Sequence, residues 1–228
     1  MRHVRAMALA PLAALFLSAM PTMATATIFH GVDFPGGAAS FADALVSYDP
    51  VIKSGEPTAP NRIPTEALGA PDYPEGSTIG YVSLGDGGSI TLRFTDNSLT
   101  GSGSSALDLW IFEIGPDEED TFVEISKDGV NWSSVGKVFG STSGIDIDAF
   151  GFGTGDFFSF VRLTDDTNEG DQTGASVGAD IDAVGAITTA PPVVVPEPGA
   201  LAVIGLGVAG LGFARRRAHA TSVRVAIG

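Results

Sequence analysis

The feature that most constrains the fold is a series of short stretches in which apolar and polar residues alternate. In Ser89 to Phe94 every second residue is apolar, as in a strand with one buried face. Thr121 to Phe139 holds two such stretches around Asp128-Gly129, a dipeptide that favours a tight type I′ hairpin turn. Because a side-chain period of two belongs to strands, these stretches predict β-structure.

Further stretches extend this pattern along the chain. Strands are expected at Leu107–Ile114, whose nearly continuous apolar run fits a central strand, and at Phe157–Leu163 and Ala179–Ile187. One short helix is expected at Phe41–Val46. Several strands separated by Gly and Asp turns predict an all-β fold, an antiparallel β-sandwich.

The first 26 residues predict an export signal that is not part of this fold. Arg2 and Arg5 precede an apolar run, and Ala24-Thr25-Ala26 has the A-x-A form of a signal-peptidase cleavage site. We therefore expect an N-terminal signal helix that signal peptidase removes after Ala26.

Three elements follow one another at the other end of the chain. They are Val195-Pro196-Glu197-Pro198, an apolar run from Gly199 to Ala214, and Arg215-Arg216-Arg217. The run is shorter than the roughly 20 residues that span a bilayer core. We expect a hydrophobic sorting helix that inserts transiently, with the arginines on the cytoplasmic side. An ordinary single-pass anchor is the alternative.

This order of elements resembles the PEP-CTERM sorting signal. The resemblance implies an exported protein of a Gram-negative bacterium, whose tail is recognised and removed by an exosortase. It also implies a transient anchor in the inner membrane and a final place at the cell surface or in the extracellular matrix.

The two ends define the expected domain organisation. Residues 1–26 are the signal peptide and 27–189 form one β-sandwich domain. Residues 190–198 are a Pro-rich linker with the Pro-Glu-Pro motif, 199–217 the hydrophobic sorting segment with its basic cluster, and 218–228 a tail.

The central domain is strongly acidic. Only Glu197 of the 27 Asp and Glu lies outside it, but six of the 12 Lys and Arg do, so its net charge is about −20. This charge excludes nucleic acid as a partner, because nucleic acid needs a basic face, and it favours divalent cations. The chain has no Cys, so the exported domain is not stabilised by disulfides. A structural cation could therefore contribute to the stability of the fold.

A second resemblance covers Leu68 to Ile187. It rests on an ordered series of motifs: Ala67–Asp72, Val82–Gly85 with Gly87–Ile90, Asp108–Glu113 and Val123–Trp132. The series is similar to one found in bacterial surface proteins, and its last part resembles the strand-turn-strand of discoidin-type domains. The resemblance implies a galactose-binding-like jelly roll, and many such domains bind sugars or carry calcium.

The candidate chemistry consists almost entirely of carboxylates. An acidic loop, Thr164 to Asp171, leads to Gly178–Asp182, and alternate residues of a strand share one face. Calcium prefers six to eight oxygen ligands. The predicted calcium ligands are Asp165, Asp166, Asp171, Asp180 and Asp182. The spacing is not that of an EF-hand, and a solvated polar loop with Asp at turns is the alternative.

Ser143–Gly151 echoes Ala179–Gly185, since both contain Asp-Ile-Asp. The echo indicates either a second cation site or two similar strand starts. We favour the strand starts, because Ile145, Ile147 and Phe150 have the character of core residues.

Aromatic rings are the candidates for stacking on sugars. Trp110 lies in an apolar strand and is expected in the core. Tyr73, in the loop from Pro71 to Gly76, and Trp132, just past the hairpin turn, are the predicted ligand contacts. Packing is the alternative role for Trp132.

Catalysis has little support. His30 is the only histidine in residues 27–189 and Cys is absent, so neither a Cys–His nucleophile nor a familiar zinc site can be built. We predict a non-catalytic β-sandwich for adhesion or structural association with exopolysaccharide, supported by calcium. A specific carbohydrate-binding module and a glycoside-cleaving enzyme with paired carboxylates are the alternatives.

Overall fold

The computed structural model describes residues 26–114, 119–170 and 173–193. The strands are β1 Thr27–Phe29, β2 Val32–Phe34, β3 Ala44–Asp49, β4 Val82–Ser83, β5 Ser89–Arg93, β6 Ser98–Leu99, β7 Leu109–Glu113, β8 Thr121–Ser126, β9 Trp132–Val138, β10 Thr142–Ile145, β11 Phe160–Asp165, β12 Asp180–Ala186 and β13 Thr189–Ala190. Short 3-10 helices are η1 Gly37–Ser40, η2 Ala59–Asn61, η3 Pro64–Ala67 and η4 Asp148–Phe150.

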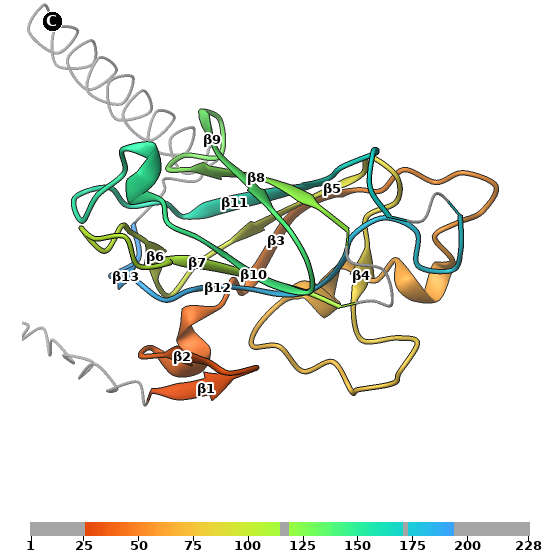
Figure 1. The fold of residues 1–228 in the computed structure, drawn as a ribbon, viewed down its shortest axis with the longest axis horizontal. Coiled ribbons are helices and arrows are strands. Elements are labelled where there is room, and N and C mark those ends of the chain that lie inside the picture. Colours follow the sequence, from red (N-terminus) through yellow and green to blue (C-terminus); the bar gives the residue numbers. More distant parts are fainter. Residues whose placement is uncertain (1–25, 115–118, 171–172, 194–228) are drawn as a thin grey trace, which may run out of the picture.

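Two larger antiparallel sheets form the two layers of the domain (Figure 1). One has five strands in the order β3-β5-β11-β8-β9, and the other has four in the order β10-β7-β12-β4. Two-stranded pairs, β1-β2 and β6-β13, complete the structure. The β1-β2 hairpin lies beside the outer side of the four-stranded sheet (Figure 1).

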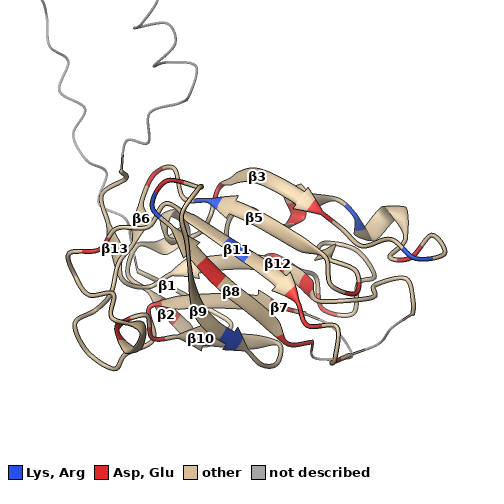
Figure 2. Ribbon diagram, turned by 90° about the horizontal axis from the view of Figure 1, so that it is seen from above, with Lys and Arg blue, Asp and Glu red and all other residues tan. Residues whose placement is uncertain are grey.

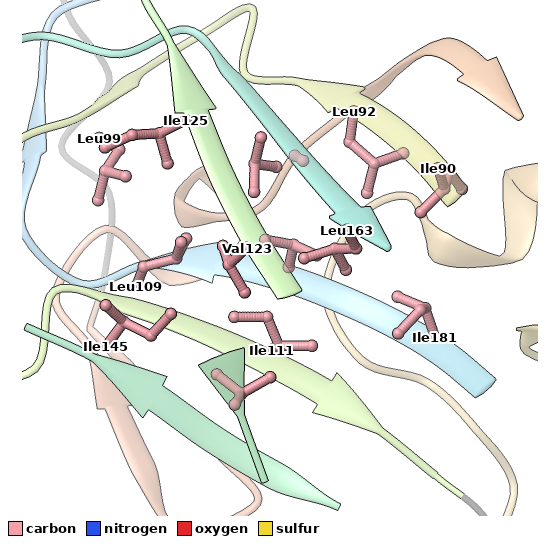
Figure 3. Packing of buried hydrophobic residues seen from close by; sticks show 14 of the residues in the cluster. Ile90, Leu92, Leu99, Leu109, Ile111, Val123, Ile125, Ile145, Leu163 and Ile181 are labelled. Atoms are coloured by element: carbon pink, nitrogen blue, oxygen red, sulfur yellow. The ribbon is translucent and has the colours of Figure 1, made fainter. Parts of the chain in front are cut away.

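The inner faces of the two sheets share one hydrophobic core (Figure 3). Ile90 of β5 and Val123 and Ile125 of β8 come from the five-stranded sheet, and Leu109 and Ile111 of β7 come from the other. These residues alternate along their strands because the pleat sends every second side chain to the same face. Burying each stabilises the fold by about 1.5–3 kcal/mol.

The outer face of the four-stranded sheet is also covered. Phe112 of β7 and Ala183 of β12 pack with Phe34 and Phe41, which come from the N-terminal hairpin and from the residue after η1. Gly185 leaves room for this layer, since a Cβ there would lie 2.7 Å from the Phe34 and Phe41 rings. Double burial explains why Leu107–Ile114 reads as a nearly continuous apolar run.

The predicted antiparallel all-β architecture is confirmed. Strands β5, β7, β8, β9 and β12 lie within the stretches that predicted them, and β7 is internal in its sheet as expected. Strand β11 begins at Phe160 and not at Phe157. The predicted signal helix, apart from Ala26, and the sorting helix lie outside the described residues.

The predicted two-residue turn between β8 and β9 is wrong. Ser126 pairs with Trp132, so the whole stretch between them forms the loop. Asp128 Oδ1 accepts hydrogen bonds from the backbone N–H groups of Val130 and Asn131, both at 2.8 Å. A type I′ turn needs positive φ at both central residues, but only Gly129 of the pair has it, at 74°. The Asp side chain therefore builds a longer loop.

The short helix predicted at Phe41–Val46 is also wrong. Phe41 forms a bridge with Gly185, and β3 pairs with β5 from Ala44 onward. A helix this short is unstable without tertiary support. Pairing with the edge of β5 that would otherwise be open therefore makes this segment a strand.

We predict that Ile125→Ala lowers the free energy of unfolding by about 2–4 kcal/mol, because it leaves a cavity in the shared core. Val130→Ala is the matched control, since Val130 is 77% exposed, and it should change stability by less than about 0.5 kcal/mol. Urea denaturation measures both. Equal effects of the two substitutions would contradict this description of the core.

Candidate functional site

The loop that carries Tyr73 borders an open pocket of about 660 Å³. Tyr73 and Tyr81 line it from this loop, and Asn61 of η2 and Ser176 line it from other parts of the chain. The aromatic rings offer apolar surface. Asn61 Nδ2 donates to Ala175 O at 2.8 Å, whereas Asn61 Oδ1 has no partner among the described residues. The Ser176 hydroxyl hydrogen-bonds with Tyr81 and Asp180. This is the composition of a small-molecule or sugar site.

Contacts within the loop hold Tyr73 in place. Its hydroxyl donates a hydrogen bond to the backbone oxygen of Ser77 at 2.7 Å. Its ring meets that of Tyr81 edge to face, with centroids 5.7 Å apart. Ser77 N in turn donates to Pro74 O at 2.9 Å. The ring is therefore placed before any ligand arrives.

Asp182, a predicted calcium ligand, fixes the start of this loop. The pairing of β12 with β7 shifts between Ile181 and Ala183, so Asp182 is the extra residue of a β-bulge. Its buried Oδ1 accepts a hydrogen bond from Asp72 N at 3.4 Å, and Tyr73 N contributes another. Burial raises the pKa of Asp182 to about 6.

The other predicted calcium ligands have separate partners. Asp165 accepts hydrogen bonds from Gly87 N at 2.8 Å and Ala179 N at 2.7 Å. Asp166 pairs with Lys137 Nζ at 2.8 Å, whose hydrogen bond lowers the pKa of Asp166. Asp180 accepts a hydrogen bond from Ser83 Oγ. The structure does not bring these residues together in one ligand group, and Asp171 lies outside the described residues.

Asp180 belongs to a buried acidic region instead. The backbone N–H of Asp180 donates a hydrogen bond to Glu113 Oε1 at 3.4 Å. Asp180, Glu113 and Glu119 are all almost fully buried. Burial, together with the charge of Glu119, raises the pKa of Asp180 to about 8. Burial and the neighbouring Glu119 and Asp180 likewise raise the pKa of Glu113. These acids therefore retain protons that exposed acids would lose.

A group of three carboxylates that could hold a cation forms elsewhere, from Asp108, Asp146 and Asp148. One oxygen of each lies within 4.8 Å of the others. The pairing of Leu109 with Ile145 explains the meeting, because Asp108 precedes β7 and the other two follow β10.

Hydrogen bonds orient this group. Buried Asp108 accepts from Ile147 N at 3.1 Å and from Thr188 Oγ1 at 2.9 Å. Asp148 Oδ2 accepts from Gly103 N at 3.0 Å, and Asp146 Oδ1 accepts from Asp148 N at 2.9 Å. Hard oxygen ligands of this kind suit calcium.

The sequence pattern located this group only in part. The Asp-Ile-Asp echo indicates a second cation site or a strand start at Asp146 and Asp148. The strand start, which we favour from the sequence, is wrong, because both residues follow β10. Asp108 was missed, and its one signal is an acidic residue directly before a central strand. Ile145 and Ile147 are buried as expected, but Phe150 is 46% exposed, so its predicted core position is wrong.

Trp132, the other predicted ligand contact, lies at the start of β9 and is partly buried. The Arg162 guanidinium carbon lies 4.3 Å from the centre of its ring system, and Arg162 pairs with Glu124 at 2.6 Å. A side chain of the protein thus already contacts the ring. Trp110 packs on the outer aromatic layer, with Phe112 and its neighbours, and is only partly buried.

The predicted processing residues fall almost entirely beyond the described part of the chain. Ala24, Val195, Pro196, Glu197, Pro198, Arg215, Arg216 and Arg217 lie outside it, and Ala26 is its first residue and is exposed. Within the described ranges, no helix has the length and hydropathy needed to cross a membrane.

Comparison with known families identifies a PEP-CTERM protein-sorting motif at residues 194–217. This confirms the sorting motif read from the sequence. Proteins with this motif are exported and sorted to the cell surface in Gram-negative bacteria, and the motif implies processing by an exosortase. No curated protein matches the chain.

We predict that the free energy of unfolding falls as the pH rises from about 4 to about 8. The folded state keeps a proton on Asp180 that the unfolded state releases, so raising the pH favours unfolding. Asp180→Asn should reduce this fall by on the order of a few kcal/mol. Urea denaturation across this range measures it. Asp33→Asn, at an exposed position of β2, is the control, and an unchanged slope in Asp180→Asn would contradict the prediction.

Proposed function

We propose that the chain is an exported surface or matrix protein whose non-catalytic β domain associates with exopolysaccharide, with calcium as a supporting ion. The domain is taken as a discoidin-like jelly roll, in line with the ordered motifs from Ala67 to Trp132 and with its two packed antiparallel sheets. The sorting motif supports delivery to the place where exopolysaccharide is found.

The pocket beside Tyr73 is the observation that carries this proposal. It is open to solvent, it is lined by two tyrosines, and Asn61 and Ser176 supply polar groups beside them. Aromatic faces with a few fixed hydrogen-bonding groups suit a sugar ring. A glycan chain can continue past an open pocket, as association with a long polymer requires. A defined carbohydrate ligand, the second candidate, would use the same pocket.

The first experiment measures binding of the exported protein, purified from its host, to the host exopolysaccharide. Tyr73→Ala should weaken binding by roughly tenfold, or about 1.4 kcal/mol, because it removes the ring from the pocket wall. Phe139→Ala is a matched control, since Phe139 is 64% exposed and away from the pocket lining. Thermal melting of each variant checks that it is folded.

The outcomes separate the candidates. Loss of polysaccharide binding in Tyr73→Ala alone supports the pocket beside Tyr73 as the binding site. Loss of polysaccharide binding in Trp132→Ala, with normal binding by Tyr73→Ala, would indicate a binding site at β9 and contradict the proposal. Turnover of the polysaccharide that disappears on replacing one acid would make the protein an enzyme and would also contradict it.

The group of Asp108, Asp146 and Asp148 supports the calcium part of the proposal. At a calcium concentration tenfold above the dissociation constant, binding should stabilise the fold by about 1.4 kcal/mol, or a few degrees in Tm. Melting in EDTA and then in excess calcium measures the shift. We expect Asp146→Asn with Asp148→Asn to abolish it.

The matched control for calcium is Asp180→Asn with Asp182→Asn, which should keep the shift. Loss of the shift only in this control would place calcium at the ligands first predicted from the sequence. The absence of any shift in the unaltered protein would remove calcium from the proposed function.

A further inference from the structure

A second pocket adjoins the one beside Tyr73. It has a volume of about 410 Å³ and shares Pro60, Ser77 and Ile79 with the first. These shared lining residues place the two pockets side by side, so one glycan chain that runs along the surface passes both. Ile79, which lines both pockets, and Ile63 of the second pocket are exposed, and they add apolar surface to that of Tyr73.

The charged residues that line the two pockets all have the same sign. Glu75 lines the first pocket, and Glu66 and Asp72 line the second. No Lys or Arg occurs among the described lining residues. Arg62 lies between the lining residues Asn61 and Ile63 in the chain, and its charge influences Tyr48 of β3. Burial raises the pKa of the Tyr48 hydroxyl, and the positive charge of Arg62 lowers it. Figure 2 shows how sparse Lys and Arg are on the domain as a whole.

A buried carboxylate that is hydrogen-bonded to the backbone of Asp72, a lining residue of the second pocket, reinforces this pattern. Asp182 Oδ1 accepts a hydrogen bond from Asp72 N, and the charges of Asp72 and Glu66 add to the effect of burial in raising the pKa of Asp182. Its Oδ2 atom is buried, and no described group forms a hydrogen bond with it. A buried carboxylate oxygen without a partner is costly, and a nearby positive charge would reduce that cost.

We infer that the two adjoining pockets select a glycan that carries unacetylated amino groups, with the sugar rings on the tyrosine side and an ammonium group near Glu66 and Asp72. The inference rests on the proposed function, since it names the class of glycan that the same pocket takes. It also accounts for the acidic lining, which association with a neutral polymer would not need.

Other charged ligands fit this geometry less well. A divalent cation needs several ligand oxygens close together, and in the described residues the one acidic group that meets this condition is that of Asp108, Asp146 and Asp148. An ammonium group needs only single N–H···O contacts. A uronate polymer would bring its carboxylates against Glu66, Asp72 and Glu75, and like charges repel.

The test compares glucosamine oligosaccharides with N-acetylglucosamine oligosaccharides of the same length, by calorimetry with the exported protein. Both present the same sugar ring, so the difference reports the amino group. We expect the unacetylated form to bind roughly tenfold more tightly at low salt. This preference should shrink as salt is added, since exposed charge pairs are screened.

Charge-neutralising variants locate the preference. Glu66→Gln and Asp72→Asn should each reduce the preference for the unacetylated form several-fold while leaving binding of the acetylated form unchanged. Glu169→Gln is the matched control, because Glu169 is exposed and lines neither pocket. It should leave both affinities as they are.

The two proposals fail in different ways. Equal or tighter binding of the acetylated form would overturn the inference and leave the proposed function standing. If neither these oligosaccharides nor the host exopolysaccharide binds, the proposed function fails as well. Equally tight binding of a lysine hexapeptide would overturn the inference, because charge alone would then explain the affinity.

Discussion

The burial of β7 and β12 on both faces is the constraint on which the rest of the structure depends. Ile111 points into the shared core, and Phe112 points into the aromatic layer beneath the N-terminal hairpin. Polar side chains are therefore found at the strand ends and at the bulge of β12. Asp108 and Glu113 lie at the two ends of β7, so the carboxylates gather at opposite ends of the same central pair.

The antiparallel pairing of these two strands then determines which acids meet. At one end Asp180 begins β12 beside Glu113, and burial raises the pKa of both groups. At the other end Asp108 meets Asp146 and Asp148 after β10, in a group that could hold a cation. The number of acids does not predict either arrangement. Burial and the supply of N–H donors decide whether a carboxylate keeps its charge.

The bulge at Asp182 connects this central pair to the pocket. Because the extra residue leaves the ladder, its carboxylate can hold the backbone of Asp72 and so position the loop that carries Tyr73. A feature of the sheet thus shapes a surface site. This exported domain has no disulfides. Hydrogen bonds between sheet and loop therefore hold the loop in place, as disulfides do in other secreted proteins.

Local patterns were enough to predict β5, β7, β8, β9, β11 and β12, but not β3 or the shorter strands. The side-chain period of two marked β5, β8 and β9, and the long apolar run marked β7 as central. Local reasoning failed where distant partners decided the outcome. Phe41–Val46 had the composition of a short helix but pairs with β5 and Gly185, and the Asp128-Gly129 turn became a longer loop through Asp128 side-chain hydrogen bonds.

By itself the sequence determined the antiparallel β class and the sorting motif, because periodicity and a short linear signal are local properties. It also predicted Tyr73 as a ligand contact, a role that stays a prediction, and the structure places that residue on a pocket wall. Only the tertiary structure decided which carboxylates meet. In the described residues, the group of three carboxylates that could hold a cation includes none of Asp165, Asp166, Asp180 and Asp182, and it contains Asp108 instead. Strand pairing and a single bulge set those distances, and both depend on residues far apart in the chain.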